Sequence, residues 1–493
     1  MKSIQKDAGV SCEGRYDPGA SQDRSVASSR SAFFTFDRLV TTLLFLAIAL
    51  SAFLMPAQGD TWWQLRAGQE MWLGRNVLLR DTFSHTVSGV YWPNHEWLSQ
   101  IVFYAAYAIG GLPFLTIVSG SAVMAAWLLA WRLTPGSTRF RFLLTSLALG
   151  SSSTIWSPRP QVLSLFLLAL TMWLLISRRY FWLPLVFLVW ANLHGAVVMG
   201  VLVLGGALIA TVVERRKDVP RLALACTGCM LATLATPLGL TFWTEIPLSL
   251  GRIRQLGIQE WAPSRLTAPS LIPFWLIAAA LVGLMVARTR ELFRNREASR
   301  RGALTICVCA LALLPLALTA ERNVPPFLLL AVPAIAVLST LRSGADGTSL
   351  RPSPRARLNG AIMAVAVVLV LGTIVYAYTR AIDHLHWTPM SNDSLSALRA
   401  CRGNLYNRYD EGGYLIWFAP DHKVFLDGRQ DPYPVSLIKE QVRVETTGDF
   451  QDVFRRYDIH CAYVPADSLV SVRLVNAGWT ALFRDAHWAV LTD

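Results

Sequence analysis

Charged residues are scarce in this sequence. Asp, Glu, Lys and Arg make up 16% of the 493 residues, whereas hydrophobic residues make up 53%. Soluble domains carry about a quarter of charged residues, so this chain lacks the polar side chains needed to cover a soluble surface. The shortage excludes a soluble globular protein and predicts an integral membrane protein.

The sequence also lacks an internal repeat and a removable signal peptide. Repeats are typical of transporters built from two similar halves, so their absence weighs against that class. The first 37 residues are polar and Ser-rich, with no apolar stretch before Leu39. We expect residues 1–37 to form a disordered cytoplasmic tail, and Leu39–Met55 to be an uncleaved first span.

Apolar runs recur along the chain at lengths near the ~20 residues that cross a bilayer. They predict a polytopic α-helical membrane protein with about eleven transmembrane helices, near 39–55, 113–132, 141–155, 160–177, 181–193, 196–213, 221–237, 270–287, 303–319, 324–340 and 359–378. Gly110, Gly111 and Pro113 interrupt the apolar pattern. We therefore expect residues 98–112 to form an interfacial or re-entrant helix instead of a full span.

The net charge of +13 is explained by topology, so we expect no nucleic-acid partner. Basic residues crowd three short loops, at 215–221, 288–301 and 342–357. Short loops rich in Lys and Arg stay in the cytoplasm, and all three fall on the side of the N-terminus. The sequence predicts a multi-pass protein of the cytoplasmic (inner) membrane with a cytoplasmic N-terminus.

Three parts of the chain are then expected outside: a first outer loop at 56–112, a second at 238–269, and the tail from 381. We expect residues 38–380 to form the transmembrane domain and 381–493 a small extracytoplasmic α/β domain. Tryptophans in the first loop suit a bilayer interface. The elements expected in the tail are strands at Lys423–Leu426 and His460–Val464 and helices at Ser391–Ala400, Pro434–Glu445 and Asp467–Ala477.

Two glycine motifs in the tail, Glu411-Gly412-Gly413-Tyr414 and Asp427-Gly428-Arg429, resemble turns at element ends. Their glycines either satisfy the geometry of a turn or bind a ligand, and the sequence leaves both interpretations open. Cysteine is sparse, and Cys226, Cys229, Cys307 and Cys309 lie in apolar runs as small buried hydrophobes. Cys401 and Cys461 lie in the part expected in an oxidising compartment, so we expect a disulfide between them.

The first outer loop concentrates carboxylates and imidazoles beside the membrane surface. Asp60 comes shortly after the first span, and it is either a general base or cation ligand, or the N-cap of the following helix. Asp81 is expected to cap a turn before Phe83, while His95 and Glu96 form either an acid–base pair or a polar helix rim. Ionisable groups on the same outer side complete the candidates: Arg159, His194, Glu260 and Arg322. Arg suits a phosphate because its planar fork donates two parallel hydrogen bonds.

These features resemble the GT-C superfamily of multi-span glycosyltransferases, which includes protein mannosyltransferases, oligosaccharyltransferases and the lipid A aminoarabinose transferase. Its members place an acidic residue in a large first outer loop, and many carry a soluble C-terminal domain outside. A more specific likeness is to a group of bacterial membrane proteins with an Asp-x-Trp-Trp-x-Leu-x-x-Gly opening, here beginning at Asp60, and an Asn-His-Glu-Trp-Leu block, here beginning at Asn94. The chain departs from the mannosyltransferases in having Thr61, not Glu, after Asp60.

The resemblance implies transfer of a sugar from a polyprenyl-phosphate carrier to a glycan, lipid or protein acceptor at the outer membrane face. Asp60 would take the acceptor proton, with Glu96 and Glu260 as further catalytic candidates. Arg159 and Arg322 would hold the donor phosphate, and Asp81, His95 and His194 would contact substrate. A divalent cation is a candidate cofactor without assigned ligands. The competing interpretations are a transporter or flippase of a lipid-linked glycan and a non-enzymatic envelope assembly factor.

Overall fold

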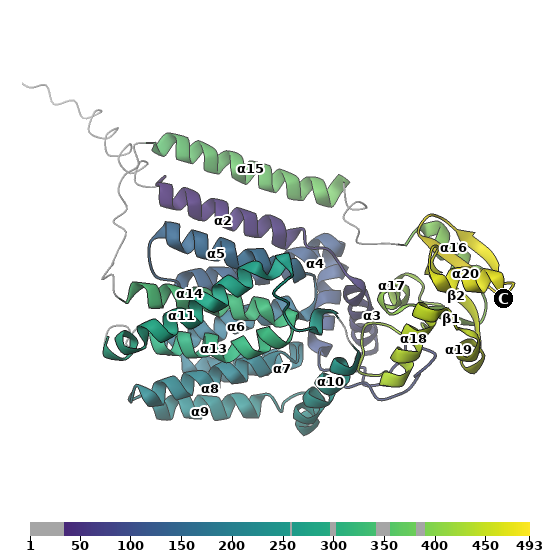
Figure 1. The fold of residues 1–493 in the computed structure, drawn as a ribbon, viewed down its shortest axis with the longest axis horizontal. Helices are drawn as coiled ribbons and strands as arrows, with labels where there is room; N and C mark the ends of the chain where they lie inside the picture. The colour runs from purple at the N-terminus through teal and green to yellow at the C-terminus, as the bar shows by residue number, and fades with distance from the viewer. Residues whose placement is uncertain (1–33, 257–258, 296–301, 342–354, 381–389) are drawn as a thin grey trace, which may run out of the picture.

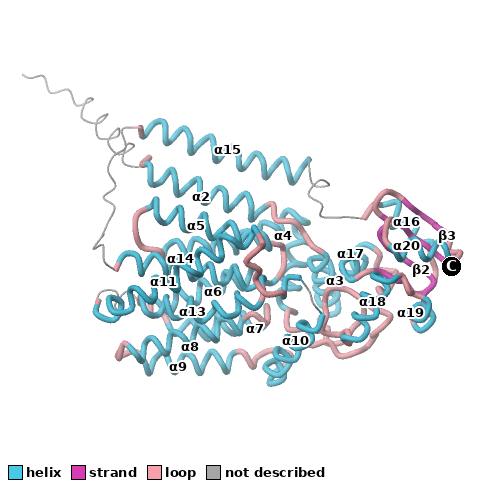
Figure 2. The backbone as a smooth tube through the Cα atoms, in the orientation of Figure 1, coloured by secondary structure: helices cyan, strands magenta, loops and turns pink. Residues whose placement is uncertain are grey.

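A computed structural model describes residues 34–256, 259–295, 302–341, 355–380 and 390–493. Most of the expected tail at 1–37 therefore lies outside the described residues. The helices of the N-terminal part run roughly parallel in a bundle, and the C-terminal part lies beyond one end of it (Figure 1). The named strands all belong to that C-terminal part (Figure 2).

Each expected span overlaps a helix of the structure. The bundle helices are α2 (Phe36–Phe53), α4 (Trp97–Leu133), α5 (Thr138–Ser152), α6 (Pro160–Ile176), α7 (Leu183–Leu193), α8 (Val197–Val213), α9 (Val219–Ala232), α11 (Ile272–Arg294), α13 (Ala303–Thr319), α14 (Val324–Thr340) and α15 (Ala356–Arg380). Among the described residues, five helical segments are long and apolar enough to cross a membrane, and five more are apolar but shorter. The apolar helices confirm a membrane protein, while the number of crossings stays a prediction.

The expected break in the long helix α4 is present. Gly110 (φ −152°, ψ 26°) and Gly111 (φ 63°, ψ −156°) leave the helical conformation inside Trp97–Leu133. The positive φ of Gly111 favours glycine, because a Cβ is strained there, and Pro113 then starts the second segment within its first turn. The first segment packs against α3 (Gly59–Gly74), the first helix of the outer loop.

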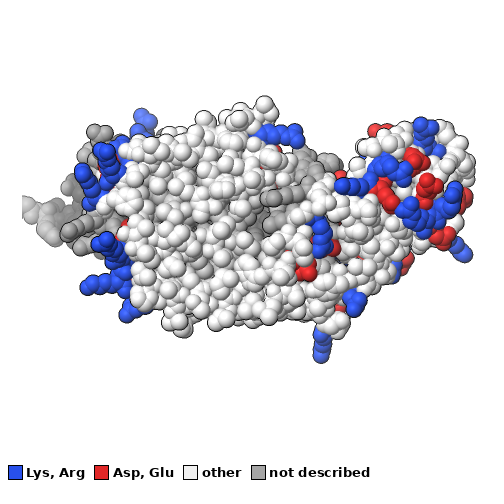
Figure 3. All heavy atoms as spheres, turned by 60° about the horizontal axis from the view of Figure 1, so that its bottom comes forward, with Lys and Arg blue, Asp and Glu red and all other residues white. Residues whose placement is uncertain are grey.

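Burial differs strongly between the helices of the bundle. In the apolar window of the segment containing α14, 83% of the residues are buried, against 6% in α15. Helix α14 is therefore the centre of the bundle, whereas α15 lies at its edge beside α2 (Figure 1). On the face shown in Figure 3, Lys and Arg gather at the bundle end farthest from the C-terminal part, and an almost uncharged band follows. Acidic and basic residues mix over the C-terminal part.

The C-terminal part contains a four-stranded sheet in the order β1-β2-β4-β3. Its strands are β1 (Asn404–Asn407), β2 (Ile459–Pro465), β3 (Thr480–Arg484) and β4 (Trp488–Thr492), and its helices are α16 (Asn392–Ala400), α17 (Tyr409–Phe418), α18 (Val435–Thr447), α19 (Gln451–Arg456) and α20 (Leu469–Asn476). Strand β1 is parallel to β2, and the other pairs are antiparallel. Alternate residues of the strands face two different apolar cores.

One of these two cores is shared with the first outer loop. Trp63 and Trp92 of the loop pack in it with Leu405 of β1 and Tyr463 of β2. The expectation that the loop tryptophans sit at a bilayer interface is therefore wrong for Trp62, Trp63 and Trp92, which are 1%, 5% and 3% exposed. Burying such large side chains contributes strongly to packing, so the loop and the tail form one folded unit.

Several expected elements of the tail are confirmed and two are wrong. Helices α16, α18 and α20 and strand β2 fall on the expected ranges. The expected strand at 423–426 forms only a single bridge, between Val424 and Ser84 of the outer loop. The Glu411-Gly412-Gly413-Tyr414 motif lies inside α17, not in a turn. A Cβ on Gly413 would lie 2.1 Å from the carbonyl oxygen of Gly59, so this glycine permits close packing of α17 on α3.

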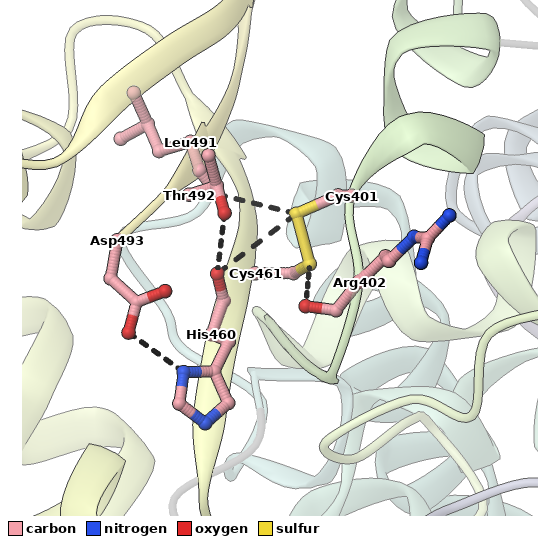
Figure 4. The surroundings of a disulfide bond; sticks show 7 residues. All are labelled: Cys401, Arg402, His460, Cys461, Leu491, Thr492 and Asp493. Atoms are coloured by element: carbon pink, nitrogen blue, oxygen red, sulfur yellow. Dashed lines mark hydrogen bonds and ion pairs between the residues drawn. A yellow bond between two sulfur atoms is a disulfide. The ribbon is translucent and has the colours of Figure 1, made fainter.

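The expected disulfide joins Cys401, at the end of α16, to Cys461 on β2, with their Cα atoms 5.9 Å apart. Figure 4 shows it beside His460, whose Nδ1 lies 2.7 Å from a carboxylate oxygen of Asp493. The bond links the start of the C-terminal part to its central strand. The other cysteines expected to be buried hydrophobes are free thiols within helices, with Cys229, Cys307 and Cys309 buried and Cys226 half-buried.

Candidate active site

A cavity of about 260 Å³ lies where the bundle meets the first outer loop and the C-terminal part. Its lining includes apolar side chains, among them Val162, Leu165 and Leu168 of α6 and Phe242 and Ile246 of α10 (Phe242–Leu256). It also includes ionisable side chains, namely Asp60, His95, Glu96, His194, Glu245, Glu260, Arg322, Arg429 and Asp431. The cavity thus offers apolar and charged groups to the same ligand.

Asp60 lies within α3 and is not its N-cap. The cap is Gln58, which exchanges hydrogen bonds with Thr61 in a capping box, so the capping alternative for Asp60 is wrong. Asp60 Oδ1 accepts a hydrogen bond from Trp63 Nε1, and Oδ2 accepts one from Arg159 Nη1, both at 3.0 Å. Burial raises the pKa of Asp60 by more than the ion pair with Arg159 lowers it. A carboxylate so placed is a stronger base than an exposed one.

Arg159 joins two acidic residues behind the cavity wall. It occupies the N-cap position of α6, where Pro160 starts the helix. Its Nη1 pairs with Asp60 at 3.0 Å, its Nη2 with Glu260 at 3.2 Å, and its Nε donates to Ser157 Oγ at 2.8 Å. Arg159 does not line the cavity, because its guanidinium is covered by these partners. In this structure Arg159 orients the two carboxylates, and the expected phosphate contact from Arg159 stays a prediction.

Arg322 does line the cavity, and it completes a row of alternating charges. Its Nη1 lies 3.3 Å from Glu260 Oε1, and its guanidinium carbon lies 4.3 Å from the centre of the Trp261 ring. Burial raises the pKa of Glu260, but Arg322 and Arg159 together lower it by more. We call the row of two acids and two arginines the charged row; its members are Asp60, Arg159, Glu260 and Arg322. Their formal charges cancel. Arg322 is its cavity-facing cation.

A chain of hydrogen bonds with a fixed direction leads from Trp190 to His194, which lies beside Glu96. Trp190 Nε1 donates to Ser164 Oγ at 2.8 Å, so the Ser164 hydroxyl hydrogen is left for His194 Nδ1, also at 2.8 Å. A neutral His194 then carries its proton on Nε2, which lies 3.3 Å from Glu96 Oε1. Burial holds the pKa of His194 well below its usual value, and nearby arginines lower it further. His194 is therefore neutral and lies with its Nε2–H near the Glu96 carboxylate.

Glu96 itself has an unusual acidity. Its Oε2 accepts a hydrogen bond from Gln64 Nε2 at 3.2 Å, and its other oxygen lies 3.8 Å from His95 Nε2. Burial raises the pKa of Glu96 to about 7, although His95 and Arg322 oppose the shift. A carboxyl group with this pKa can exchange protons near neutral pH.

Asp81 lies away from the cavity, in contrast to the expected substrate contact. Its carboxylate accepts hydrogen bonds from the backbone N–H groups of Phe83 and Ser84, which confirms the turn cap. It also lies 2.6 Å from Arg429 Nη2, and neither side chain is exposed. Asp81 is thus a structural partner of the C-terminal part, because its oxygens are fully occupied by protein donors.

The C-terminal part contributes a stretch that the candidate list missed, residues 428–431, which we call the 428–431 segment. All four residues line the cavity. A Cβ on Gly428 would lie 2.2 Å from Asp60 Oδ1, so only glycine allows the segment this close to the acid. The Asp427-Gly428-Arg429 motif was the available sequence signal, and the structure shows a turn that also borders the cavity.

A divalent cation has no evident site among the described residues. They contain no group of three or more His, Cys, Asp and Glu side chains arranged to hold a metal ion. The space between Asp60 and Glu260 is filled by the Arg159 guanidinium. The charged row therefore obtains its positive charge from arginine and does not fit a cation at that position.

Comparison with known proteins identifies the fold. No family model and no curated protein matches the chain. The archaeal oligosaccharyltransferase AglB from Archaeoglobus fulgidus, solved with an inhibitory peptide and a dolichol-phosphate, is 10% identical with a TM-score of 0.58, and the match covers 87% of this chain and 69% of that one. The same enzyme tethered to an acceptor peptide is 11% identical with a TM-score of 0.51 over 87% and 69% of the two chains. ArnT from Cupriavidus metallidurans bound to undecaprenyl phosphate is 14% identical over 91% and 97%, with a TM-score of 0.48.

The likeness shows that the chain has the fold of this oligosaccharyltransferase, as the expected resemblance implies, while membership of the GT-C superfamily stays a prediction. At this identity it shows the fold and not the reaction. The expected bacterial group defined by the Asp60 and Asn94 motifs stays a prediction.

Proposed function

We propose that this protein is a membrane glycosyltransferase that moves a sugar from a polyprenyl-phosphate carrier to an acceptor at the outer face of the cytoplasmic membrane. The observation that carries the proposal is the mixed lining of the cavity, in which Asp60, Glu96, Glu260 and Arg322 occur together with apolar side chains of α6 and α10. A lipid-linked sugar has the same mixed character, because its charged phosphate and polar sugar are attached to an apolar chain. The fold supports the proposal, since AglB has been solved with a dolichol-phosphate.

Asp60 takes the acceptor proton in this mechanism. As the acceptor oxygen forms its bond to the anomeric carbon of the sugar, the bond from that carbon to the phosphate oxygen breaks, and the phosphate leaves with the electron pair. Arg322 turns from Glu260 to the leaving phosphate and stabilises its growing charge, while Arg159 keeps Glu260 paired. Glu96 and Glu260 are the alternative bases, and His95 and His194 support the Glu96 carboxylate.

The proposed topology places the N-terminus in the cytoplasm and the C-terminal part outside. The basic residues at the far end of the bundle support it, because such residues stay in the cytoplasm (Figure 3). The disulfide between Cys401 and Cys461 also supports it, since disulfides persist in oxidising compartments. Alkaline phosphatase that is fused after residue 380 should be active, whereas alkaline phosphatase that is fused within residues 290–300 should be inactive. The reverse pattern contradicts the proposed topology.

Purified protein in lipid nanodiscs, given radiolabelled undecaprenyl-phosphate sugars and bacterial envelope lipids and glycans, tests the reaction. A transferase converts the label into a new glycosidic product and releases undecaprenyl phosphate. Movement of labelled lipid across a vesicle membrane without a new product identifies a flippase instead. Neither product nor movement, with a donor panel that covers hexoses and pentoses, leaves the assembly-factor interpretation and refutes the proposal.

A further inference from the structure

The 428–431 segment contains a residue in a strained conformation. Gln430 has φ 61°, in the left-handed region where a side chain other than glycine, asparagine or aspartate is uncommon. Such strain persists where the surrounding structure enforces it, and it is concentrated at ligand sites. Gln430 also lines the cavity, so it is a candidate ligand-binding residue.

Both neighbours of Gln430 are fixed by the protein. Arg429 Nη2 lies 2.6 Å from an oxygen of Asp81 and 2.7 Å from one of Asp427, in a site with no exposed side-chain surface. On the other side, Ser249 Oγ of α10 donates to Asp431 Oδ1 at 2.6 Å. Arg252 Nη1 of the same helix donates to the Asp431 carbonyl at 2.8 Å. The backbone of Gln430 is therefore held against its conformational preference from both ends.

The segment offers the cavity the side-chain amide of Gln430, which lines it. The Tyr409 hydroxyl donates to the Gly428 carbonyl at 3.1 Å, so the Tyr409 oxygen is the acceptor in its bond with the Gln430 amide. This bond uses the Gln430 NH₂ group, which leaves the Gln430 amide oxygen as an acceptor for a ligand. Arg429 contributes no donor there, because its side chain is fully buried. A sugar hydroxyl, which can donate a hydrogen bond, matches the Gln430 oxygen.

The charges around the segment select the kind of ligand. Arg429 is neutralised by Asp81 and Asp427, and Arg252 lies 3.6 Å from Glu245. The carboxylate of Asp431 adds negative charge at the same wall, 3.9 Å from His95. An anionic ligand would meet cations that already have acidic partners and would lie beside the Asp431 carboxylate, whereas a neutral hydroxylated ligand can use the hydrogen-bonding groups without this repulsion.

We propose that the 428–431 segment is the subsite for a neutral carbohydrate acceptor, with the Gln430 side chain binding a sugar hydroxyl. The inference rests on the proposed function and gives its acceptor a chemical class. The contact of Gly428 with Asp60 places this subsite directly beside the proposed base, so a hydroxyl held here is within reach of the reacting position. The enforced backbone conformation of Gln430 holds this residue in the cavity lining.

Binding to the protein in nanodiscs tests the subsite without any lipid donor. The probes are the methyl glycosides of glucose, galactose and mannose, with methyl β-glucuronide as the anionic counterpart, followed by saturation-transfer NMR. The variant is Gln430→Gly, which removes the amide and relieves the strain. The matched control is Asp458→Gly, which relieves the same strain (φ 53°) at a side chain that is 82% exposed.

Wild type and the control should bind at least one neutral glycoside, and Gln430→Gly should bind it about tenfold more weakly. The melting temperature of Gln430→Gly should be equal to or above that of wild type, because glycine accepts the conformation freely. Equal binding by Gln430→Gly, a clear fall in its melting temperature, tighter binding of the glucuronide, or no glycoside binding by wild type each overturns the subsite. Since no donor is present, a chain without transferase activity would still give one of these results.

Discussion

Replacing Asp60 by Asn tests the centre of the proposed mechanism. The carboxylate accepts from Trp63 Nε1 on one oxygen and from Arg159 Nη1 on the other. An Asn side chain has only one oxygen, so in either orientation its amide group faces one of these donors. We expect that mismatch to cost about 1–3 kcal/mol of local stability, with the fold retained because Arg159 keeps Glu260 as a partner.

The loss of transfer activity in Asp60→Asn should be larger than its loss of stability can explain. Removing a general base reduces a rate roughly a hundredfold to ten-thousandfold, and the amide of Asn has no proton affinity near neutral pH. Transfer from a saturating radiolabelled lipid donor, at matched expression and with melting temperatures recorded, separates the two effects. Asp452→Asn, at a side chain that is 69% exposed, is the control for charge alone and should match wild type. Wild-type turnover by Asp60→Asn would refute the role of Asp60 as the general base and leave Glu96 and Glu260 as the candidates.

Four further predictions follow from particular contacts. If Glu96, whose pKa is about 7, acts in its ionised form, the transfer rate should rise as pH increases through that value. Glu96→Gln should abolish this rise, and a rise that persists in the variant contradicts a catalytic role for Glu96. Because the unfolded chain loses the Glu96 proton at a lower pH than the folded protein, the same shift should make the folded protein less stable as pH rises from about 4.5 to about 7, with no further loss above that. Arg429→Met should leave Asp81 and Asp427 as buried unpaired acids and cost about 3–5 kcal/mol in thermal unfolding, with Asp81→Asn milder. Replacing both Cys401 and Cys461 by Ala should destabilise the C-terminal part by about 4 kcal/mol, and proteolysis unchanged from wild type would contradict this.

Much of the secondary structure followed from local patterns in the sequence. The apolar runs gave helices at every expected span, and Gly110, Gly111 and Pro113 gave the break in α4. These features depend on residues close in the chain, so a short window contains the required information. The tail was harder, and β1, β3, β4, α17 and α19 were not expected. Their short segments are stabilised by packing with distant residues, which a local pattern does not record.

The site was predicted in part. Six of the eight candidates line one cavity, namely Asp60, His95, Glu96, His194, Glu260 and Arg322. Their expected common position on one side of the membrane was the useful signal, because loops on one side of a helix bundle converge at one end. Asp81 and Arg159 were attractive by charge alone, yet each is occupied by protein partners that sequence order does not reveal.

The sequence by itself determined the membrane class of the protein, the positions of its helices and the acids that its outer loops carry. These properties follow from composition and from neighbouring residues. Tertiary structure alone decided which charges are paired, which acid has a pKa of about 7, and that the 428–431 segment closes the cavity beside Asp60. The physical reason is distance along the chain: Arg159 meets an acid 99 residues before it and another 101 residues after it, and only folding brings such groups into one low-dielectric site.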